Sequence, residues 1–246
     1  MHKMYFDNIF YQSDKITNQV ECEKSNKEYD LFLLPHKYLD ENLAAMYKDA
    51  FSHIKDGKPI VAVSQLHNYN MNGEHFYTTE SYSTPIKNIK IDNSLLEEEF
   101  SLELLYQVAK ETNSNSMFSS IFVSLDSKEA IKELSSILKK LKKENSETVF
   151  IISGNFTSFD NSAIATKQAI KLYELLNEKA PLIHEGNKKN ISGTAYKIIE
   201  AFRLAFNKDF KLKMSINNEK LNNTLEDNAG EIYHVYGVFE WVLKIE

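Results

Sequence analysis

The stretch Tyr29-Asp-Leu-Phe-Leu-Leu-Pro35 carries apolar residues on both faces of an extended strand, and Pro35 marks its end. A strand that is apolar on both faces is typical of a parallel sheet covered by helices on both sides. Two further segments have the same pattern, Lys58-Pro-Ile-Val-Ala-Val-Ser64 and Glu147-Thr-Val-Phe-Ile-Ile-Ser153. These three runs predict buried strands of one sheet.

Helical patterns alternate with the strand-like runs along most of the chain. Apolar residues recur at helical spacing in five segments, 43–54, 92–110, 126–141, 163–178 and 194–206, and another strand is expected over 117–124. This alternation is typical of βαβ units. We therefore predict an α/β fold in which residues 1–246 form a single domain, with a central mixed, largely parallel sheet flanked by helices.

Several local features are also predicted. Asp126 is expected to cap the helix that follows it, with Glu129 completing a capping box. Segments 75–81 and 86–91 read as short strands of a side hairpin. Near the C-terminus, alternation over 209–216 predicts a half-solvated strand, whereas 232–245 should lie deeper, with a loop over 217–231 between them.

Composition narrows the function classes. The 246 residues are 42% hydrophobic, and the formal net charge of -6 argues against nucleic-acid binding, which needs a concentrated basic surface. Neither a signal-peptide pattern nor an apolar run of about 18 residues is found, so we expect no membrane association. The single cysteine, Cys22, can form no internal disulfide, which fits a cytoplasmic location.

Common catalytic motifs are missing, namely the glycine-rich dinucleotide and nucleoside-triphosphate loops, the G-x-S-x-G elbow and H-E-x-x-H. Two histidines remain of interest, because His36 directly follows the first buried strand and His67 follows the second by three residues. Ligands of open α/β sheets bind at the carboxyl ends of strands. Two histidines with a carboxylate would suit non-haem iron. Spacing alone favours the alternative, in which each histidine hydrogen-bonds its own loop.

Other polar residues are expected near the same edge. Asn155, Thr157 and Ser158 follow the fourth buried strand, and as neutral groups they can orient a ligand or water but supply no acid or base. Glu99 and Glu103 offer carboxylates. Their acidic, helix-forming segment is also typical of a solvated helix face.

Ordered motifs give the chain a resemblance to a known family. Pro35-His36-Lys37-Tyr38 resembles P-H-A-G-Y, Ser64-Gln65-Leu66-His67-Asn68 resembles G-P-S-H-H, and Tyr82-Ser83-Thr84-Pro85 with Ile89-Lys90-Ile91-Asp92 resembles W/Y-x-T-P…V-D. Further loose matches are Phe10-Tyr11-Gln12-Ser13-Asp14, Glu99-Phe100-Ser101-Leu102-Glu103, Ser153-Gly154-Asn155-Phe156-Thr157-Ser158 and Ile191-Ser192-Gly193. Together they resemble the Memo-like family, the B component of the bacterial AmmeMemoRadiSam system.

The resemblance implies a fold similar to the class III extradiol dioxygenases and a pocket at the motif positions, namely His36, His67, Phe100, Glu103, Asn155, Ser158 and Ser192. Only the two histidines keep a ligand type of the family. Phenylalanine replaces a motif histidine, asparagine the aspartate, and serines the later histidine and the cysteine. Two neutral histidines without an anion should hold iron or copper weakly or not at all.

Three functions follow as hypotheses. The favoured one is a non-catalytic or weakly metal-binding member that acts as a binding or assembly component, with AMMECR-type and radical SAM proteins as the partners implied by the resemblance. The second is a redox enzyme or oxygenase in which His36 and His67 bind iron or copper, assisted by Glu99 or Glu103. The third, unsupported by any elbow motif, is a hydrolase that pairs one of these histidines with a serine, the candidates being Ser153, Ser158 and Ser192.

Overall fold

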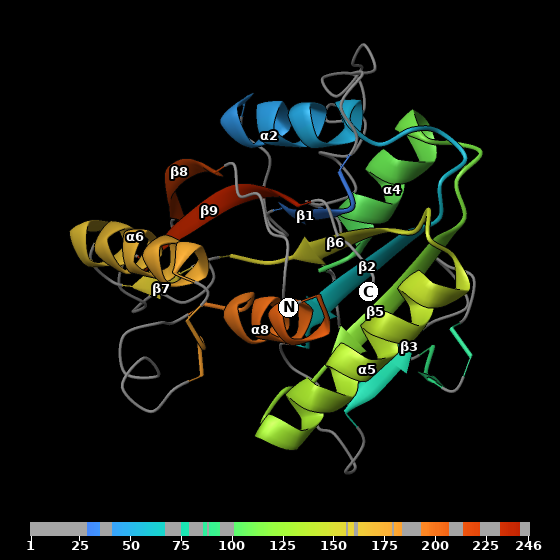
Figure 1. The fold of residues 1–246 in the computed structure, drawn as a ribbon. Helices are drawn as coiled ribbons and strands as arrows, with labels where there is room; N and C mark the ends of the chain where they lie inside the picture. Colours follow the sequence, from blue (N-terminus) through green and yellow to red (C-terminus); the bar gives the residue numbers. More distant parts are fainter. Residues whose placement is uncertain are drawn as a thin grey trace.

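The predicted alternation of strands and helices is present in the computed structural model (Figure 1). The structure describes residues 29–34, 41–66, 75–78, 86–87, 89–93, 101–155, 157–159, 162–178, 180–183, 193–206, 214–221 and 232–241. For 157–159, 214–221 and 232–241 only the backbone is described.

The parallel centre of the sheet consists of the predicted buried strands. They are β1 (Leu31–Leu34), β2 (Ile60–Gln65), β5 (Phe118–Val123) and β6 (Val149–Ser153). Their order is β5-β2-β6-β1, and every adjacent pair is parallel. Nearly every residue of these strands is buried, as expected for strands with helices on both faces. The predicted α/β fold with a largely parallel sheet is thus confirmed.

Antiparallel strands extend this centre on both sides. On one side β3 (Phe76–Thr78) runs antiparallel to β5, with β4 (Lys90–Ile91) beyond it. On the other, β9 (Ile232–Trp241) runs antiparallel to β1, and it also pairs with β7 (Thr157–Phe159) and β8 (Met214–Leu221). The full order is β4-β3-β5-β2-β6-β1-β9-β7, with β8 on β9, so the sheet is mixed.

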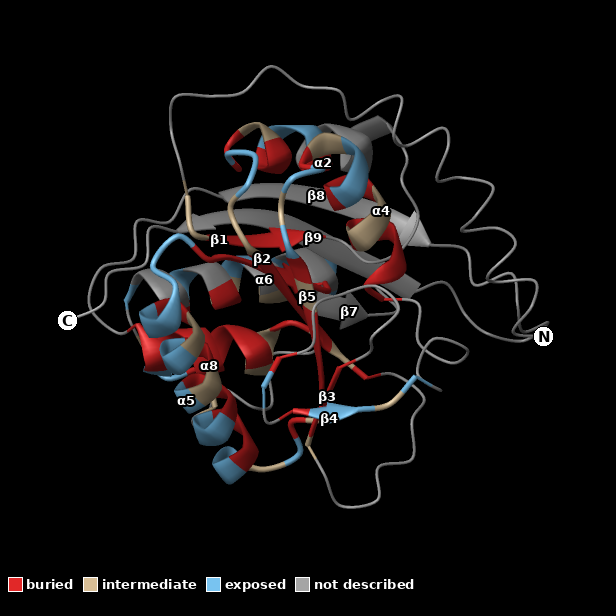
Figure 2. Cartoon of the chain, turned by 90° about the vertical axis from the view of Figure 1, so that its right-hand side faces the viewer, coloured by how far each residue is buried: buried red, intermediate tan, exposed pale blue. Residues whose placement is uncertain are grey.

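Helices cover both faces of the sheet (Figure 2). One face packs against α2 (Glu41–Ser52) and α4 (Glu103–Thr112). The other packs against α5 (Lys128–Glu144), α6 (Ser162–Asn177) and α8 (Tyr196–Ala205). Alternate residues of each strand serve the two faces: in β1, Leu31 and Leu33 join the α5 side, and Phe32 and Leu34 the α4 side.

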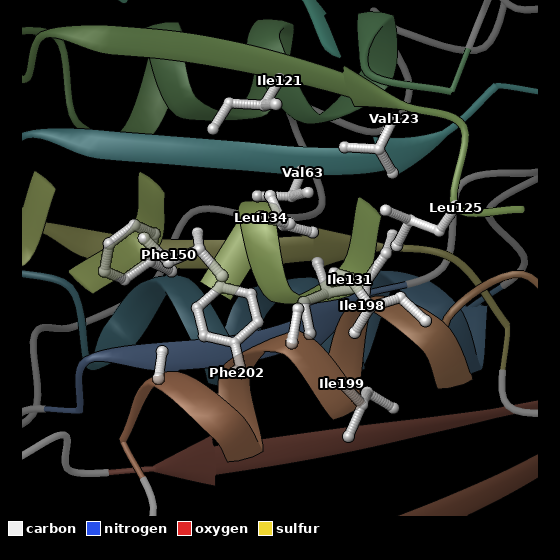
Figure 3. Packing of buried hydrophobic residues seen from close by; sticks show 14 of the residues in the cluster. Val63, Ile121, Val123, Leu125, Ile131, Leu134, Phe150, Ile198, Ile199 and Phe202 are labelled. Atoms are coloured by element: carbon white, nitrogen blue, oxygen red, sulfur yellow. The ribbon is translucent and has the colours of Figure 1, made fainter. Parts of the chain in front are cut away.

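The α5 and α8 face forms a continuous apolar core (Figure 3). Leu134 of α5 lies against Val63 of β2, Ile131 of α5 belongs to the same core, and the rings of Phe150 and Phe202 lie edge to face, with centroids 5.3 Å apart. Each such buried side chain stabilises the fold by roughly 1.5–3 kcal/mol relative to an exposed one. None of the helices in the described ranges has both the length and the apolar character that spanning a membrane requires.

The predicted cap of α5 is wrong by one residue. Ser127, not Asp126, is the N-cap: its backbone is extended (φ -127°, ψ 163°), and its hydroxyl accepts the Ala130 N–H at 3.0 Å. Glu129 is therefore the second helical residue and completes no capping box. Asp126 instead lies 3.4 Å from Nδ1 of His75, so its carboxylate serves a tertiary contact.

Three other local predictions need correction. The hairpin of 75–81 with 86–91 is wrong, because β3 and β4 run parallel, with Tyr77 opposite Lys90. Of the expected 92–110 helix, the structure shows α4 from Glu103 onward; 92–93 and 101–102 are not helical, the Asp92 N–H donates to the Thr78 carbonyl at 2.9 Å, and 94–100 lie outside the described residues. Residues 217–221 belong to β8, because each of them pairs with a residue of β9, from Asn217 opposite Tyr236 to Leu221 opposite Ile232. The remaining parts of the predicted 209–216 strand and 217–231 loop, 209–213 and 222–231, lie outside the described residues.

Candidate functional site

The carboxyl ends of the four parallel strands lie together at one edge of the sheet. The register places Ser153 opposite both Leu34 and Ser64, and Gln65 opposite Val123. Open α/β sheets bind ligands in the crevice outside this edge. We therefore take this carboxyl edge, where β1, β2, β5 and β6 end, as the candidate site.

Ser153 ties this edge to the start of α4. Its side chain is fully buried, and its hydroxyl donates a hydrogen bond to the Ser101 carbonyl. The Ser64 hydroxyl lies 3.4 Å from the Ser153 carbonyl. Because the Ser153 proton is directed at a backbone carbonyl, its oxygen is not activated by a base in the described structure. This contact brings the residues that precede α4 against the end of β6.

Asn155 joins the end of β6 to the segment that begins α8. Its Oδ1 accepts the Thr194 N–H at 2.9 Å, and its own backbone N–H donates to the Thr194 Oγ1 at 3.1 Å. Its carbonyl accepts the Ala195 N–H at 3.1 Å. An N–H donor fixes which end of the amide faces Thr194, because only the oxygen can accept. We call this set of bonds among Asn155, Thr194 and Ala195 the Asn155 clamp.

Two glycines permit the close approach of β6 to α8. A Cβ atom on Gly154 would lie 2.8 Å from the Thr194 Oγ1 and 3.2 Å from the Ala195 Cβ, so a side chain would push the two segments apart. Gly193, just before Thr194, has a φ of 145°, a backbone conformation that favours glycine. The local sequence is therefore suited to holding the clamp.

Glu103 is the first residue of α4 and is only 1% exposed. Its Oε2 has no hydrogen-bond partner among the described residues, and the same holds for the buried Oε1 of Gln65. A helix N-terminus favours a negative charge, but burial disfavours it more strongly here and raises the Glu103 pKa to about 7. Near neutral pH this carboxyl therefore exchanges a proton readily and can act as either donor or acceptor.

The structure places only part of the predicted pocket. Glu103 and Asn155 lie at the carboxyl edge, and Ser158 lies in β7, where its backbone is paired with that of His234. His36, His67, Phe100 and Ser192 lie outside the described residues, as does Glu99, so the histidine pair stays a prediction.

Two contributors were missed at the sequence level. The sequence pattern includes Gln65 only as part of a motif, and it includes Thr194 only as the first residue of an expected helix. Thr194 had only a partial signal, because a threonine directly before an apolar helical run is typical of an N-cap. In the structure Ala195 is the N-cap of α8, and the Thr194 hydroxyl bonds Asn155 instead. Gln65 gave no such signal, because its unpartnered oxygen depends on burial by residues distant in sequence.

The described residues do not fit a divalent-metal centre. Among them, no group of three or more His, Cys, Asp or Glu side chains lies close enough to hold an ion. At the position where the resemblance places an aspartate, the Asn155 oxygen is engaged by Thr194, and burial raises the pKa of Glu103, at the start of α4, which favours its neutral form. Iron and copper sites favour imidazole, thiolate and carboxylate donors that are free to coordinate.

No family model matches the chain, and no curated protein matches it significantly.

Proposed function

We propose that this protein is a divergent Memo-like member that works as a binding or assembly component, with a carboxyl-edge crevice that binds metal weakly or not at all. The observation that carries this proposal is the Asn155 clamp. The residue at the family's aspartate position is neutral, 2% exposed and hydrogen-bonded to the start of α8. Asn155 therefore holds the end of β6 against the start of α8. An anionic metal ligand at this position would instead have its oxygens available to the metal.

The chemistry of a ligand at the carboxyl edge follows from the polar groups there that have no hydrogen-bond partner. The Glu103 Oε2 and the Gln65 Oε1 are buried acceptors without partners among the described residues. Leaving such atoms unpaired costs about 1–3 kcal/mol each, so they favour a ligand or peptide segment that brings N–H or O–H donors. As protein partners, the resemblance suggests AMMECR-type and radical SAM proteins.

Metal analysis tests this proposal against the alternative, a redox enzyme or oxygenase that uses His36 and His67 with iron or copper. Protein purified without an affinity tag is analysed for bound elements and titrated with ferrous iron and with copper. We expect the wild type to bind no more tightly than the His36→Ala/His67→Ala variant. His75→Ala, which removes an imidazole outside the predicted pair, serves as the matched control.

Stoichiometric iron or copper that is lost only in the double alanine variant would overturn the proposal and favour the redox enzyme. The buried carboxyl of Glu103 is the observation that keeps this alternative open, because it is a potential anionic donor at the same edge.

Restoring the family's aspartate gives a second, independent test. An aspartate at position 155 can accept the Thr194 N–H as asparagine does, while it adds the negative charge that a cation requires. If loss of that charge dismantled the site, Asn155→Asp should bind iron at least about tenfold more tightly than wild type. The gain should vanish when His36 and His67 are also replaced by alanine. An unchanged affinity in Asn155→Asp would contradict this account of the site.

A further inference from the structure

A pocket of about 410 Å³ opens in the helical layer between the start of α5, the α8 helix and residues 181–183. Its lining residues are Lys128, Ile131, Lys132, Pro181, Ile183, Glu200 and Leu204. None of them belongs to the carboxyl-edge site, so the pocket is argued independently of the proposed function. Its volume lies within the range of about 300–1,000 Å³ typical of small-molecule sites.

One wall of the pocket is held by a buried ion pair within α8. Glu200 accepts hydrogen bonds from the Nε and Nη2 of Arg203, both at 2.7 Å, and from the Leu182 N–H at 3.1 Å. Glu200, Arg203 and Leu182 are all buried. The carboxylate therefore anchors the 181–183 segment against α8, and the pocket is preformed rather than dependent on a ligand for its shape.

The charge of the lining is positive. Glu200 is neutralised by Arg203, so it repels an incoming anion little. Lys128 and Lys132 are exposed and lie one helical turn apart on α5, so that their ammonium groups can reach the same ligand. Within the described residues, neither lysine has a carboxylate within ion-pair distance.

The rest of the lining is apolar. Ile131, Pro181, Ile183 and Leu204 supply hydrocarbon surface, and Leu204 is one of the larger exposed apolar residues of the protein, at 38% exposure. A ligand that complements this lining needs an apolar body together with an anionic head. A small inorganic anion would leave the apolar surface uncovered, whereas a neutral hydrocarbon would leave both lysines without a counter-charge.

We propose that this pocket binds an amphipathic monocarboxylate, such as a medium-chain fatty acid, with its chain against Ile131, Ile183 and Leu204 and its carboxylate between Lys128 and Lys132. The pairing of two cations with one carboxylate gives orientation, and burial of the chain gives most of the affinity.

Decanoate and decanol, which share a chain and differ in charge, test the proposal on the full-length protein. Binding is followed by calorimetry and by the methyl NMR signals of Ile131, Ile183 and Leu204. We expect decanoate to shift these signals and to bind at least about tenfold more tightly than decanol. Equal affinity for both compounds, or shifts confined to other residues, would overturn the proposal.

Matched lysine variants test whether the preference for decanoate over decanol comes from Lys128 and Lys132. Lys128→Gln/Lys132→Gln should weaken decanoate binding about tenfold and leave decanol unchanged. Lys139→Gln/Lys143→Gln, which removes two exposed lysines with the same spacing on α5, should leave both affinities as in wild type. Leu204→Trp places a larger side chain in the pocket and should weaken both ligands. Loss of decanoate binding in the Lys139/Lys143 control equal to that in the pocket variant would show a non-specific charge effect and sink the proposal.

Discussion

Two buried glutamates on opposite faces of the sheet differ in whether a cation and hydrogen-bond donors pair with their carboxyl groups. Glu200 of α8 is 4% exposed and accepts three hydrogen bonds, two of them from Arg203. Glu103 of α4 is 1% exposed, and one of its oxygens has no partner among the described residues. A buried carboxylate is tolerated when a cation pairs with it, whereas an unpaired one retains a proton. The first glutamate is therefore part of the framework, and the second is available to a ligand.

The largest expected effect comes from converting Glu200 into an unpaired carboxylate. Arg203→Leu removes both guanidinium hydrogen bonds and leaves a buried charge without its cation. Removing one partner of a buried pair typically costs about 3–5 kcal/mol. We expect the free energy of unfolding, measured by urea denaturation at pH 7, to fall by this amount.

A double variant separates the pairing from simple loss of packing. Arg203→Leu/Glu200→Leu removes both charges, and it should recover much of the lost stability because no uncompensated carboxylate remains. A single variant that loses less than about 1 kcal/mol would show that Glu200 needs no cation, and the contrast with Glu103 would fail.

Glu103 should instead make stability depend on pH. Its pKa is raised from 4.5 to about 7 by burial, so the folded protein holds this proton where the unfolded chain has lost it. Stability relative to Glu103→Gln is therefore fully present below about pH 4.5, declines as pH rises to about 7 and is constant above that. The total change is roughly 3 kcal/mol, from the linkage between pKa and folding.

Urea denaturation of wild type and Glu103→Gln between about pH 4 and pH 8 measures this difference. Glu111→Gln, on the exposed side of the same helix, is the control and should show no such trend. A difference between wild type and Glu103→Gln that stays flat across this range would mean that burial does not raise the Glu103 pKa above its value in the unfolded chain.

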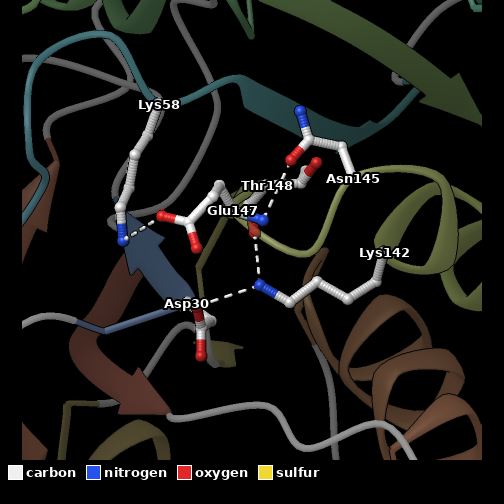
Figure 4. Close-up of polar contacts among 6 residues, drawn as sticks. All are labelled: Asp30, Lys58, Lys142, Asn145, Glu147 and Thr148. Carbon is white, nitrogen blue, oxygen red and sulfur yellow. Dashed lines mark hydrogen bonds and ion pairs between the residues drawn. The ribbon is translucent and has the colours of Figure 1, made fainter.

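A third buried charge, at the amino edge of the sheet, extends the comparison to a cation (Figure 4). Lys142 of α5 is 3% exposed, and its Nζ donates to Asp30 at 2.9 Å and to the Thr148 carbonyl at 2.8 Å. Like Glu200, it is paired, so we expect it to support the fold.

Replacing Lys142 should cost less than replacing Arg203. Lys142→Met keeps the apolar stem but leaves the Thr148 carbonyl and the partly exposed Asp30 without this donor, at a cost of about 1–3 kcal/mol. Lys140→Met removes an exposed lysine 4.0 Å from Glu144 and should cost at most about 0.5 kcal/mol. Urea denaturation compares the two, and equal losses would contradict a supporting role for the buried pair.

The parallel strands at the centre of the sheet could be predicted because their own residues indicate that they are buried. Runs such as Ile60–Gln65 and Val149–Ser153 are apolar on both faces, which only a covered parallel sheet explains. The predictions were wrong where contacts with segments distant in sequence determine the local structure. Residues 217–220 are polar yet form part of a strand on β9, and Ser127 rather than Asp126 caps α5, while Asp126 contacts His75.

The position of the candidate site could be predicted from the sequence, but the hydrogen bonding and protonation of its residues could not. Strand ends placed Asn155 at the carboxyl edge, and the motif comparison included Glu103. Neither the clamp of Asn155 on Thr194 nor the raised pKa of Glu103 follows from spacing, because the first depends on a segment distant in sequence and the second on burial by the surrounding fold. Polar partners of this kind are set by tertiary packing.

The smallest expected effect tests the Asn155 clamp, whose polar groups are paired, whereas the Glu103 Oε2 has no partner among the described residues. Thr194→Val keeps the side-chain volume but removes the hydroxyl, which accepts the Asn155 N–H at 3.1 Å and donates to the Asn155 Oδ1 at 3.3 Å, while the bond from the Thr194 N–H to the Asn155 Oδ1 remains. Loss of these two partly buried hydrogen bonds, the second of them long, should lower the free energy of unfolding by about 1 kcal/mol. Ser136→Ala, which removes an exposed hydroxyl bond to the Lys132 carbonyl on α5, should lower it by less in the same urea titrations. A Thr194→Val variant as stable as wild type would mean that the clamp does not hold α8 in place. The Asn155 side chain would then be available to a ligand, as we propose for Glu103.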